Sequence, residues 1–215
     1  MSGKIYNNEK AIISLTSWKK RIKTVGLTLF SLLKQCPSFH LVLVLSEEEF
    51  PHKEAELPSD ILSLLNAHQL EVLWVYANTK SFKKVIPTMR IYKDVPIISA
   101  DDDCIYICNY AQELFDAYME DNTRPINYRK SSYAYCTCGP ATLYPPCLFN
   151  YIIAKYDNMA VHNCLDDGFM QKLLSEIKCQ PRHISTKFPC FFHDEIAPIT
   201  GSQNVAKWRA DIRYK

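Results

Sequence analysis

The chain has 215 residues, of which 47% are hydrophobic and 22% are charged, and its formal net charge is +2. This length and balance are typical of one globular domain with a substantial core, and they exclude a disordered chain. Because the charge is nearly balanced and the basic residues are dispersed along the chain, we expect no nucleic-acid partner.

No apolar segment of the sequence approaches the roughly 18–20 residues of a membrane-spanning helix. The N-terminal residues also lack the apolar run of a secretion signal. The sequence therefore predicts a cytoplasmic protein, with any association with the inner membrane being peripheral.

The nine cysteines are an odd number and include no C-x-x-C pair. Two pairs lie close in sequence, Cys104 with Cys108 and Cys136 with Cys138, but no histidine follows either pair at a spacing typical of zinc sites. We therefore expect reduced thiols buried in the core rather than a zinc site.

Apolar runs of strand length alternate with helical periodicity through the first half of the chain. The predicted strands are 11–17, 40–46, 70–76 and 95–100. The predicted helices are 24–36, 59–68 and 81–92, the last interrupted at Pro87. Nearly continuous apolar strands that alternate with helices are typical of a parallel sheet covered on both faces. The sequence therefore predicts an α/β fold with a mostly parallel sheet.

The pattern is more mixed after the fourth predicted strand. Amphipathic periodicity predicts helices over 109–121, 145–156 and 166–177, and a short helix over 204–213. The tyrosine-rich segment 124–139 indicates a strand or hairpin, and the segment 183–195 indicates a further strand.

Three consecutive aspartates, Asp101–Asp103, directly follow the predicted strand 95–100. In open α/β sheets, ligands bind beyond the carboxyl ends of the strands. A divalent cation such as Mg²⁺ or Mn²⁺ takes carboxylate oxygens at about 2.0–2.6 Å and removes the repulsion between them. A solvated acidic turn that caps the next helix is the alternative, but the position after a buried strand favours the metal site.

The segment PIISADDDCIY, residues 96–106, resembles the DxD motif of GT-A glycosyltransferases, in which acidic residues at a strand end hold a metal and a nucleotide sugar. The lysine pair of SFKKVIP, the opening segment ISLTSWKKRIKTVGLTLFSLLKQ and the later CLDDGFMQKL resemble segments of bacterial glycosyltransferases that build capsule or lipopolysaccharide sugars. Together these segments extend the resemblance over about residues 11–193.

The resemblance implies a single GT-A-like domain over 1–215, with a Rossmann-like, mostly parallel sheet flanked by helices and a mixed C-terminal half. It assigns nucleotide binding to 11–103 and acceptor binding to 104–195, and it leaves 196–215 as a C-terminal tail.

The same resemblance assigns residues to the donor substrate. Those expected to contact the nucleotide or its phosphates are Thr16, Ser17, Arg21, Lys83, Lys84, Asp101 and Asp102. The expected metal ligands are Asp103 and Asp101, with His193 as a third ligand from the C-terminal segment. A solvated surface is the alternative for Arg21 and the two lysines, and a hydrogen-bonded core residue is the alternative for His193.

Two further carboxylates, Asp166 and Asp167, begin the predicted helix 166–177. By resemblance to inverting GT-A enzymes, Asp167 is expected to remove a proton from the acceptor hydroxyl, and Asp166 to position the acceptor. Simple capping is the alternative, because the helix dipole stabilises carboxylates at an N-terminus. Gly168 departs from the family pattern, in which a larger residue is common.

The resemblance thus implies a metal-dependent, inverting hexosyltransferase that moves a sugar from a nucleoside diphosphate sugar, expected to be a UDP-sugar, to a glycan or lipid-linked acceptor in bacterial surface polysaccharide synthesis. A sugar nucleotidyltransferase is one alternative, although SLTSWKKR lacks the glycines of that family's phosphate loop. A non-catalytic GT-A-like binding module is another.

Overall fold

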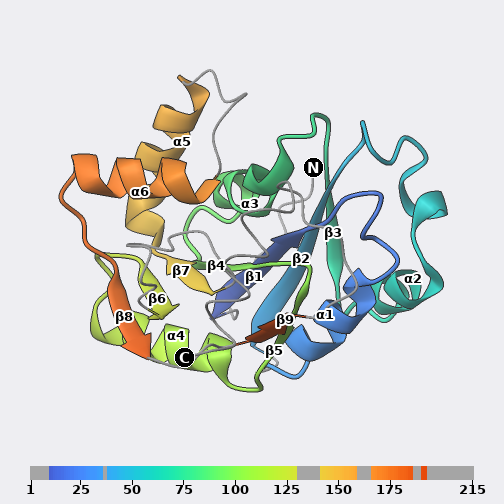
Figure 1. Ribbon diagram of the computed structural model, residues 1–215, viewed down its shortest axis with the longest axis horizontal. Helices are drawn as coiled ribbons and strands as arrows, with labels where there is room; N and C mark the ends of the chain where they lie inside the picture. The colour runs from blue at the N-terminus through green and yellow to red at the C-terminus, as the bar shows by residue number, and fades with distance from the viewer. Residues whose placement is uncertain (1–9, 36–37, 130–140, 159–165, 186–189, 193–215) are drawn as a thin grey trace.

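A seven-stranded sheet forms the centre of the molecule (Figure 1). The computed structural model describes residues 10–35, 38–129, 141–158, 166–185 and 190–192, and the structural statements below concern these residues. The strands lie in the order β3-β2-β1-β4-β7-β6-β8. Their bounds are Ala11–Thr16 for β1, Phe39–Ser46 for β2, Glu71–Val75 for β3, Ile97–Ala100 for β4, Ile126–Arg129 for β6, Thr142–Tyr144 for β7 and Arg182–Ser185 for β8.

The sheet is mostly parallel, as the sequence predicts. Strands β1 to β4 pair in parallel, with Ile12 opposite both His40 and Ile97. Strand β7 is antiparallel to both of its neighbours, β4 and β6, and β8 pairs in parallel with β6. One sheet therefore runs through both halves of the chain, and the prediction of an α/β domain with a mostly parallel sheet is confirmed.

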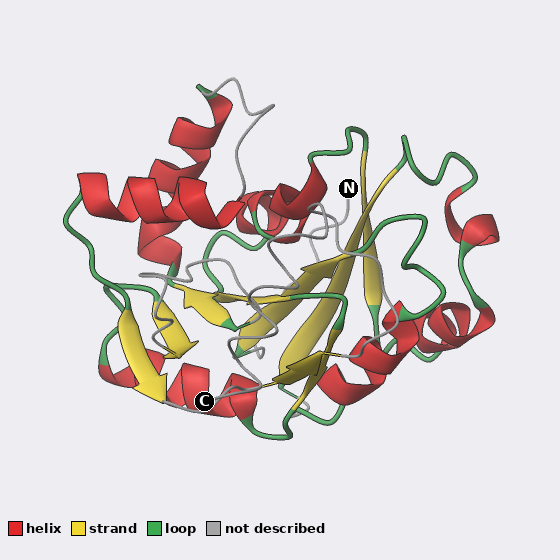
Figure 2. Cartoon of the chain, viewed as in Figure 1, coloured by secondary structure: helices red, strands yellow, loops and turns green. Residues whose placement is uncertain are grey.

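Helices cover both faces of this sheet (Figure 2). The α-helices are α1 (Val25–Leu32), α2 (Ser59–Asn66), α3 (Ile86–Ile91), α4 (Tyr110–Glu120), α5 (Phe149–Asp157) and α6 (Asp166–Glu176). Short 3-10 helices are η1 (Lys53–Glu56), η2 (Lys80–Lys84) and η3 (Pro146–Leu148). Alternate strand residues divide the core: Ile13 packs with α1, α2 and α4, and Ile12 packs with α3, α5 and α6.

Two predicted elements are divided in the structure. The predicted helix 81–92 consists of η2 followed by α3, and Pro87 lies in the first turn of α3, where its missing amide hydrogen costs nothing. The predicted strand 183–195 contains most of β8 and a separate short strand, β9 (Cys190–Phe192). The predicted helix 204–213 lies outside the described residues.

Strand β9 pairs antiparallel with β5 (Cys104–Tyr106), a three-residue strand that the sequence patterns do not indicate. The prediction of buried thiols holds for Cys104 and Cys190, but it is wrong for Cys108 and Cys147, which are exposed. The pair Cys136 and Cys138 lies outside the described residues.

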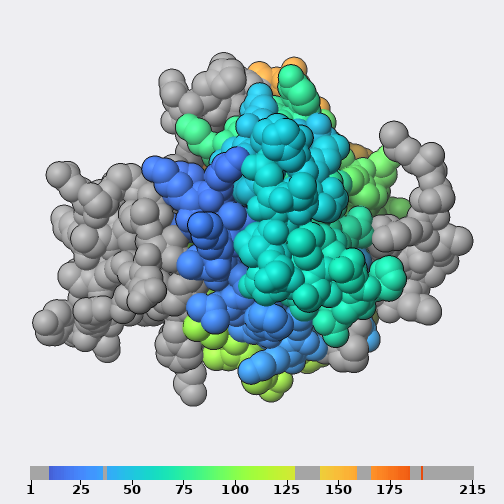
Figure 3. All heavy atoms as spheres, turned by 90° about the vertical axis from the view of Figure 1, so that its right-hand side faces the viewer, coloured from blue at the N-terminus to red at the C-terminus, as the bar shows by residue number. Residues whose placement is uncertain are grey.

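The outer edge on the β3 side is covered by the segments between β2 and α3, together with residues around α1 (Figure 3). None of the described helices combines the length and the apolar composition that crossing a bilayer requires.

The strand order creates a topological switch point between β1 and β4. From β1 the chain moves outward to β2 and then β3, and it returns to the opposite side of β1 as β4. The connections that leave β1 and β4 at their carboxyl ends therefore diverge, which is the usual position of a ligand site in such sheets.

Candidate active site

Acidic and basic side chains from four segments converge at this switch point. Ser17 and Arg21 follow β1, and Asp101–Asp103 follow β4. Lys84 ends η2, and Asp166 begins α6. Ion pairs and hydrogen bonds join these groups, so the structure brings together most of the side chains that the sequence predicts for the site.

The middle aspartate is held inside the protein. Arg21 Nη1 lies 2.5 Å from Asp102 Oδ1, and Ser17 Oγ donates to Asp102 Oδ2 at 2.6 Å. The side chains of Arg21 and Asp102 are only 5% and 4% exposed. Burial raises the pKa of the Asp102 carboxyl, while Arg21 and the Ser17 hydroxyl oppose that rise. In this arrangement both carboxylate oxygens are engaged by protein donors, and Thr28 of α1 also donates to the Asp102 carbonyl at 3.0 Å.

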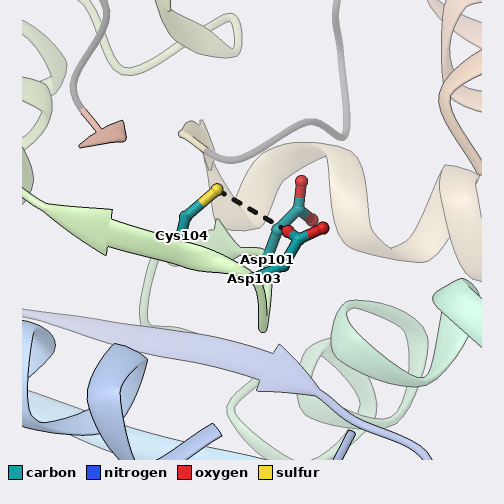
Figure 4. Close-up of side chains that lie close together, drawn as sticks. All are labelled: Asp101, Asp103 and Cys104. Atoms are coloured by element: carbon teal, nitrogen blue, oxygen red, sulfur yellow. Dashed lines mark hydrogen bonds between the residues drawn. The ribbon is translucent and has the colours of Figure 1, made fainter. Parts of the chain in front are cut away.

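The outer aspartates remain nearer the surface. The Asp103 side chain is 18% exposed, and its Oδ2 lies 3.3 Å from Arg21 Nη2. The Cys104 thiol donates to Asp103 Oδ1 at 3.7 Å (Figure 4). The Asp101 side chain is 28% exposed, and the Asp101 amide donates to the Tyr106 hydroxyl at 2.7 Å, which fixes the backbone as it leaves β4.

The outer aspartates suit a divalent cation. One carboxylate oxygen of Asp101, one of Asp103 and the Cys104 sulfur all lie within 4.8 Å of one another. Carboxylate oxygens are the ligands that Mg²⁺ and Mn²⁺ prefer, with phosphate and water completing the coordination sphere. Asp101 and Asp103 are therefore the described residues best placed to hold such an ion.

Lys84 joins the two acidic motifs. Its Nζ lies 2.7 Å from Asp101 Oδ1 and 3.2 Å from Asp166 Oδ2. The contact with Asp166 is an ion pair without hydrogen-bond geometry, and this buried oxygen has no hydrogen-bond partner among the described residues. Burial raises the pKa of Asp101; the Lys84 ammonium opposes this rise, and the nearby Asp103 and Asp166 add to it.

The charges of this cluster do not balance. Among the residues that the structure describes, the ion pairs of four carboxylates involve only two cations, Arg21 and Lys84; the carboxylates are those of Asp101, Asp102, Asp103 and Asp166. The formal excess of two negative charges equals the charge of one divalent cation.

Two predicted site residues point elsewhere. Lys83 Nζ lies 2.6 Å from Glu49 Oε2 and donates to Asn78 Oδ1 at 2.9 Å, beyond the ends of β2 and β3. The Thr16 hydroxyl, at the carboxyl end of β1, donates to the Val44 carbonyl of the neighbouring strand β2 at 2.7 Å. The structure therefore separates Lys83 from Lys84, its neighbour in sequence, and gives the Thr16 hydroxyl a backbone partner.

The remaining predicted residues lie at the second acidic motif and beyond it. Asp167 is half-buried in the first turn of α6, next to the buried Asp166. A Cβ added at Gly168 would meet no atom within 4 Å, so packing does not require glycine there. His193 lies outside the described residues.

Sequence patterns miss the residues that support the site. Glu49 and Asn78 bind Lys83 from two different connections, and Tyr106 and Thr28 hold the backbone of the acidic turn. Of these, only Glu49 has a local signal, since it ends a run of three glutamates directly after β2.

Comparison with known proteins supports the fold. No family model matches the chain, and no curated protein matches it in sequence. A solved mannosyltransferase from Pyrobaculum calidifontis, in complex with GDP-mannose and Mn²⁺, is 11% identical with a TM-score of 0.63, over 95% of this chain and 62% of that one.

Solved nucleotidyltransferases are similar to a comparable degree. The 4-diphosphocytidyl-2C-methyl-D-erythritol synthase from Anaerococcus prevotii is 13% identical with a TM-score of 0.60, over 96% of this chain and 100% of that one. A cytidylyltransferase from Leptospira borgpetersenii is 10% identical with a TM-score of 0.59, over 86% of this chain and 82% of that one. At these identities the likeness shows a shared fold, and the chemistry of this chain has to be argued from its own residues.

Proposed function

We propose that this chain is a metal-dependent glycosyltransferase that uses a nucleoside diphosphate sugar, with a UDP-sugar as the expected donor. The observation that carries the proposal is the pair of outer aspartates at the switch point, in a cluster of four carboxylates whose ion pairs among the described residues involve two cations. The mannosyltransferase that shares the fold was solved with both a nucleotide sugar and Mn²⁺, which supports this choice of ligands.

In this proposal Asp101 and Asp103 hold Mg²⁺ or Mn²⁺, and His193 is a candidate for a third ligand. The cation would neutralise charge on the departing diphosphate. Asp102 has a positioning role, because its contacts with Arg21 and Ser17 fix the turn that carries the outer aspartates. This assignment differs from the family resemblance at Asp102, which the resemblance places in contact with the nucleotide.

Lys84 is the better placed of the two lysines to meet the diphosphate, because it already contacts Asp101. Lys83 and Thr16 contribute by shaping the neighbouring edge beyond β1 and β2, where the nucleoside would lie.

The second acidic motif supplies the acceptor chemistry. Asp167 is proposed to take the proton from an acceptor hydroxyl, which corresponds to an inverting reaction, and Asp166 to hold the helix start against Lys84. We propose a glycan or lipid-linked acceptor in surface polysaccharide synthesis, with peripheral docking at the membrane where the acceptor is a lipid.

The proposal is tested with a panel of nucleotide sugars. We expect Mn²⁺-dependent hydrolysis of one donor in the absence of acceptor, and its loss on removal of the metal. Asp167→Asn should lower sugar transfer by roughly 10²–10⁴-fold while donor affinity stays unchanged. Unchanged transfer in Asp167→Asn would remove this residue from the base role.

A nucleotidyltransferase is the second candidate, because two of the similar solved structures are cytidylyltransferases. Incubation with a nucleoside triphosphate and a sugar phosphate separates the two functions. Release of pyrophosphate, without hydrolysis of any nucleotide sugar, would favour the nucleotidyltransferase. If neither reaction occurs, the non-catalytic binding module is favoured.

A further inference from the structure

The Lys84 ammonium lies where it competes with a bound metal ion. It donates to Asp101 Oδ1 at 2.7 Å, and Asp101 is one of the two carboxylates that approach each other within 4.8 Å at the candidate metal site. A dication on Asp101 would thus bind next to a positive charge. Like charges at such short range repel, and water screens this repulsion less in a partly buried site than at an open surface.

Lys84 has little room to withdraw from the site. Its side chain is 7% exposed, and its other carboxylate partner, Asp166, is 8% exposed. The contact with Asp166 is longer, at 3.2 Å, and lacks hydrogen-bond geometry, so Asp101 is the stronger of the two partners. A free cation on Asp101 Oδ1 would therefore have to displace Lys84 from its preferred acceptor, and one on Oδ2 would lie beside the ammonium.

A diphosphate changes this balance. Its anionic oxygens offer the ammonium a new partner and also supply ligands to the cation, so a nucleotide and a metal arriving together remove the repulsion that a free cation meets. We propose that Lys84 is an internal counter-ion that disfavours binding of a free metal at Asp101 and Asp103, so that tight metal binding requires a nucleoside diphosphate. This inference rests on the proposed metal–nucleotide site.

The neighbouring lysine provides a matched control. Lys83 belongs to the same 3-10 helix and is 2% exposed, but its ammonium pairs with Glu49 and Asn78. Asn78 Oδ1 also accepts from the Lys80 amide at 3.1 Å, which anchors the start of η2. Substitution at either lysine thus removes one buried ammonium from the same short helix, and only Lys84 contacts the candidate metal site.

The experiment measures Mn²⁺ affinity from the electron paramagnetic resonance signal of free Mn²⁺, with and without UDP, and with GDP in parallel. For wild type we expect weak binding of Mn²⁺ alone and much tighter binding with nucleotide. Lys84→Met should bind Mn²⁺ alone about tenfold more tightly than wild type, which corresponds to the loss of about 1.4 kcal/mol of competition. The gain from nucleotide should shrink in the same variant. Lys83→Met should match wild type in its affinity for Mn²⁺ alone, since Lys83 does not contact Asp101 or Asp103.

Two results separate the inference from the function on which it rests. If nucleotide strengthens Mn²⁺ binding to wild type, but Lys84→Met binds Mn²⁺ alone no more tightly, the counter-ion role is wrong and the metal–nucleotide site stands. If neither wild type nor any variant binds Mn²⁺, with or without nucleotide, both the counter-ion role and the proposed metal–nucleotide site are wrong. Circular dichroism checks that each variant folds. If Lys84→Met does not fold, Lys84→Gln replaces it, because the glutamine amide keeps a neutral donor beside Asp101. The same gain in Mn²⁺ affinity is expected of Lys84→Gln.

Discussion

Two ion clusters flank the end of β4, and they differ in how completely their charges are satisfied. On the side of α1, the side chains of Arg21 and Asp102 are about 5% exposed, and the Ser17 hydroxyl donates to the second oxygen of the Asp102 carboxylate. On the side of η2 and α6, Asp101 is 28% exposed and shares one ammonium with Asp166. In the proposed function, adjacent aspartates of identical charge thus have different roles: the first cluster fixes the turn, and the second keeps charge available for a ligand.

The largest effect is expected from breaking the first cluster, in which both oxygens of the Asp102 carboxylate have partners. Arg21→Met leaves the buried Asp102 carboxylate without its cation, and loss of one partner of a buried pair costs about 3–5 kcal/mol of unfolding free energy. Urea denaturation measures this loss. The double variant Arg21→Met/Asp102→Leu, which removes both charges, should recover much of it.

A loss below about 1 kcal/mol in Arg21→Met, the size expected of an exposed pair, would contradict the assignment of Asp102 to a structural role. The first cluster would then be as open as the second, and Asp102 would be available to a ligand.

The second effect comes from removing Asp103, the other proposed metal ligand, which lies beside Arg21 at the surface of the first cluster. Asp103→Ala should weaken Mn²⁺-dependent UDP binding by at least about 100-fold, since substitutions of groups that only support a metal ligand already cost 10–100-fold. Calorimetric titration measures the affinity, and thermal unfolding should change little because Asp103 is partly exposed. Asp121→Ala, at a half-buried carboxylate after α4 that pairs with Arg124, is the control and should bind like wild type.

As the pH falls, Asp101 of the second cluster should take up a proton before ordinary surface carboxylates do. Burial raises the pKa of Asp101, so this residue takes up a proton at a higher pH than a solvated aspartate does and then cannot bind a cation. Mn²⁺ affinity in the presence of UDP should therefore fall as the pH is lowered from 7, by up to about tenfold per pH unit for each proton that must leave. An affinity that stays constant down to the pKa of 3.8 that is normal for aspartate would contradict this account.

The smallest effect concerns a third, fully exposed cluster between α5 and α6. Hydrogen bonds from Lys155 and Tyr151 lower the pKa of Glu176 below 4.5. The ionised form is thus favoured in the folded state, so the stabilisation is present above pH 4.5 and is lost as the pH falls through the folded-state pKa. Glu176→Gln should lower the Tm at pH 7 by no more than about 2 °C, and the difference from wild type should shrink as the pH is lowered below 4.5.

The sequence predicts those features of the fold and of the two clusters that depend on local sequence patterns. Apolar runs indicate β1 to β4: β1 and β4 are buried on both faces, and β3, at the edge of the sheet, is half-buried throughout. The aspartates lie beyond the carboxyl end of the sheet because they directly follow β4. The second acidic motif begins a helix, α6, as its amphipathic periodicity predicts.

The parts that were missed depend on contacts between distant segments. The three-residue strand β5 forms by pairing with β9, nearly ninety positions later, and so leaves no recognisable period in its own sequence. The ammonium groups of Lys83 and Lys84 bind different carboxylates, those of Glu49 and Asp101. The tight 3-10 turn of η2 separates the two side chains, and their acceptors lie on other connections of the chain. Nothing in D-D-D marks the middle residue for burial, because its partners follow a different strand.

Calorimetric titration of the wild-type chain with UDP, in the presence of Mn²⁺ and again with a chelator, tests the central claim most directly. We predict saturable heat of binding with Mn²⁺ and a large loss of affinity without it, because the aspartates beyond β4 and the diphosphate need a shared cation. The same affinity in both titrations, with GDP giving the same result, would contradict the claim that the excess charge beyond β4 exists to hold a metal–nucleotide complex.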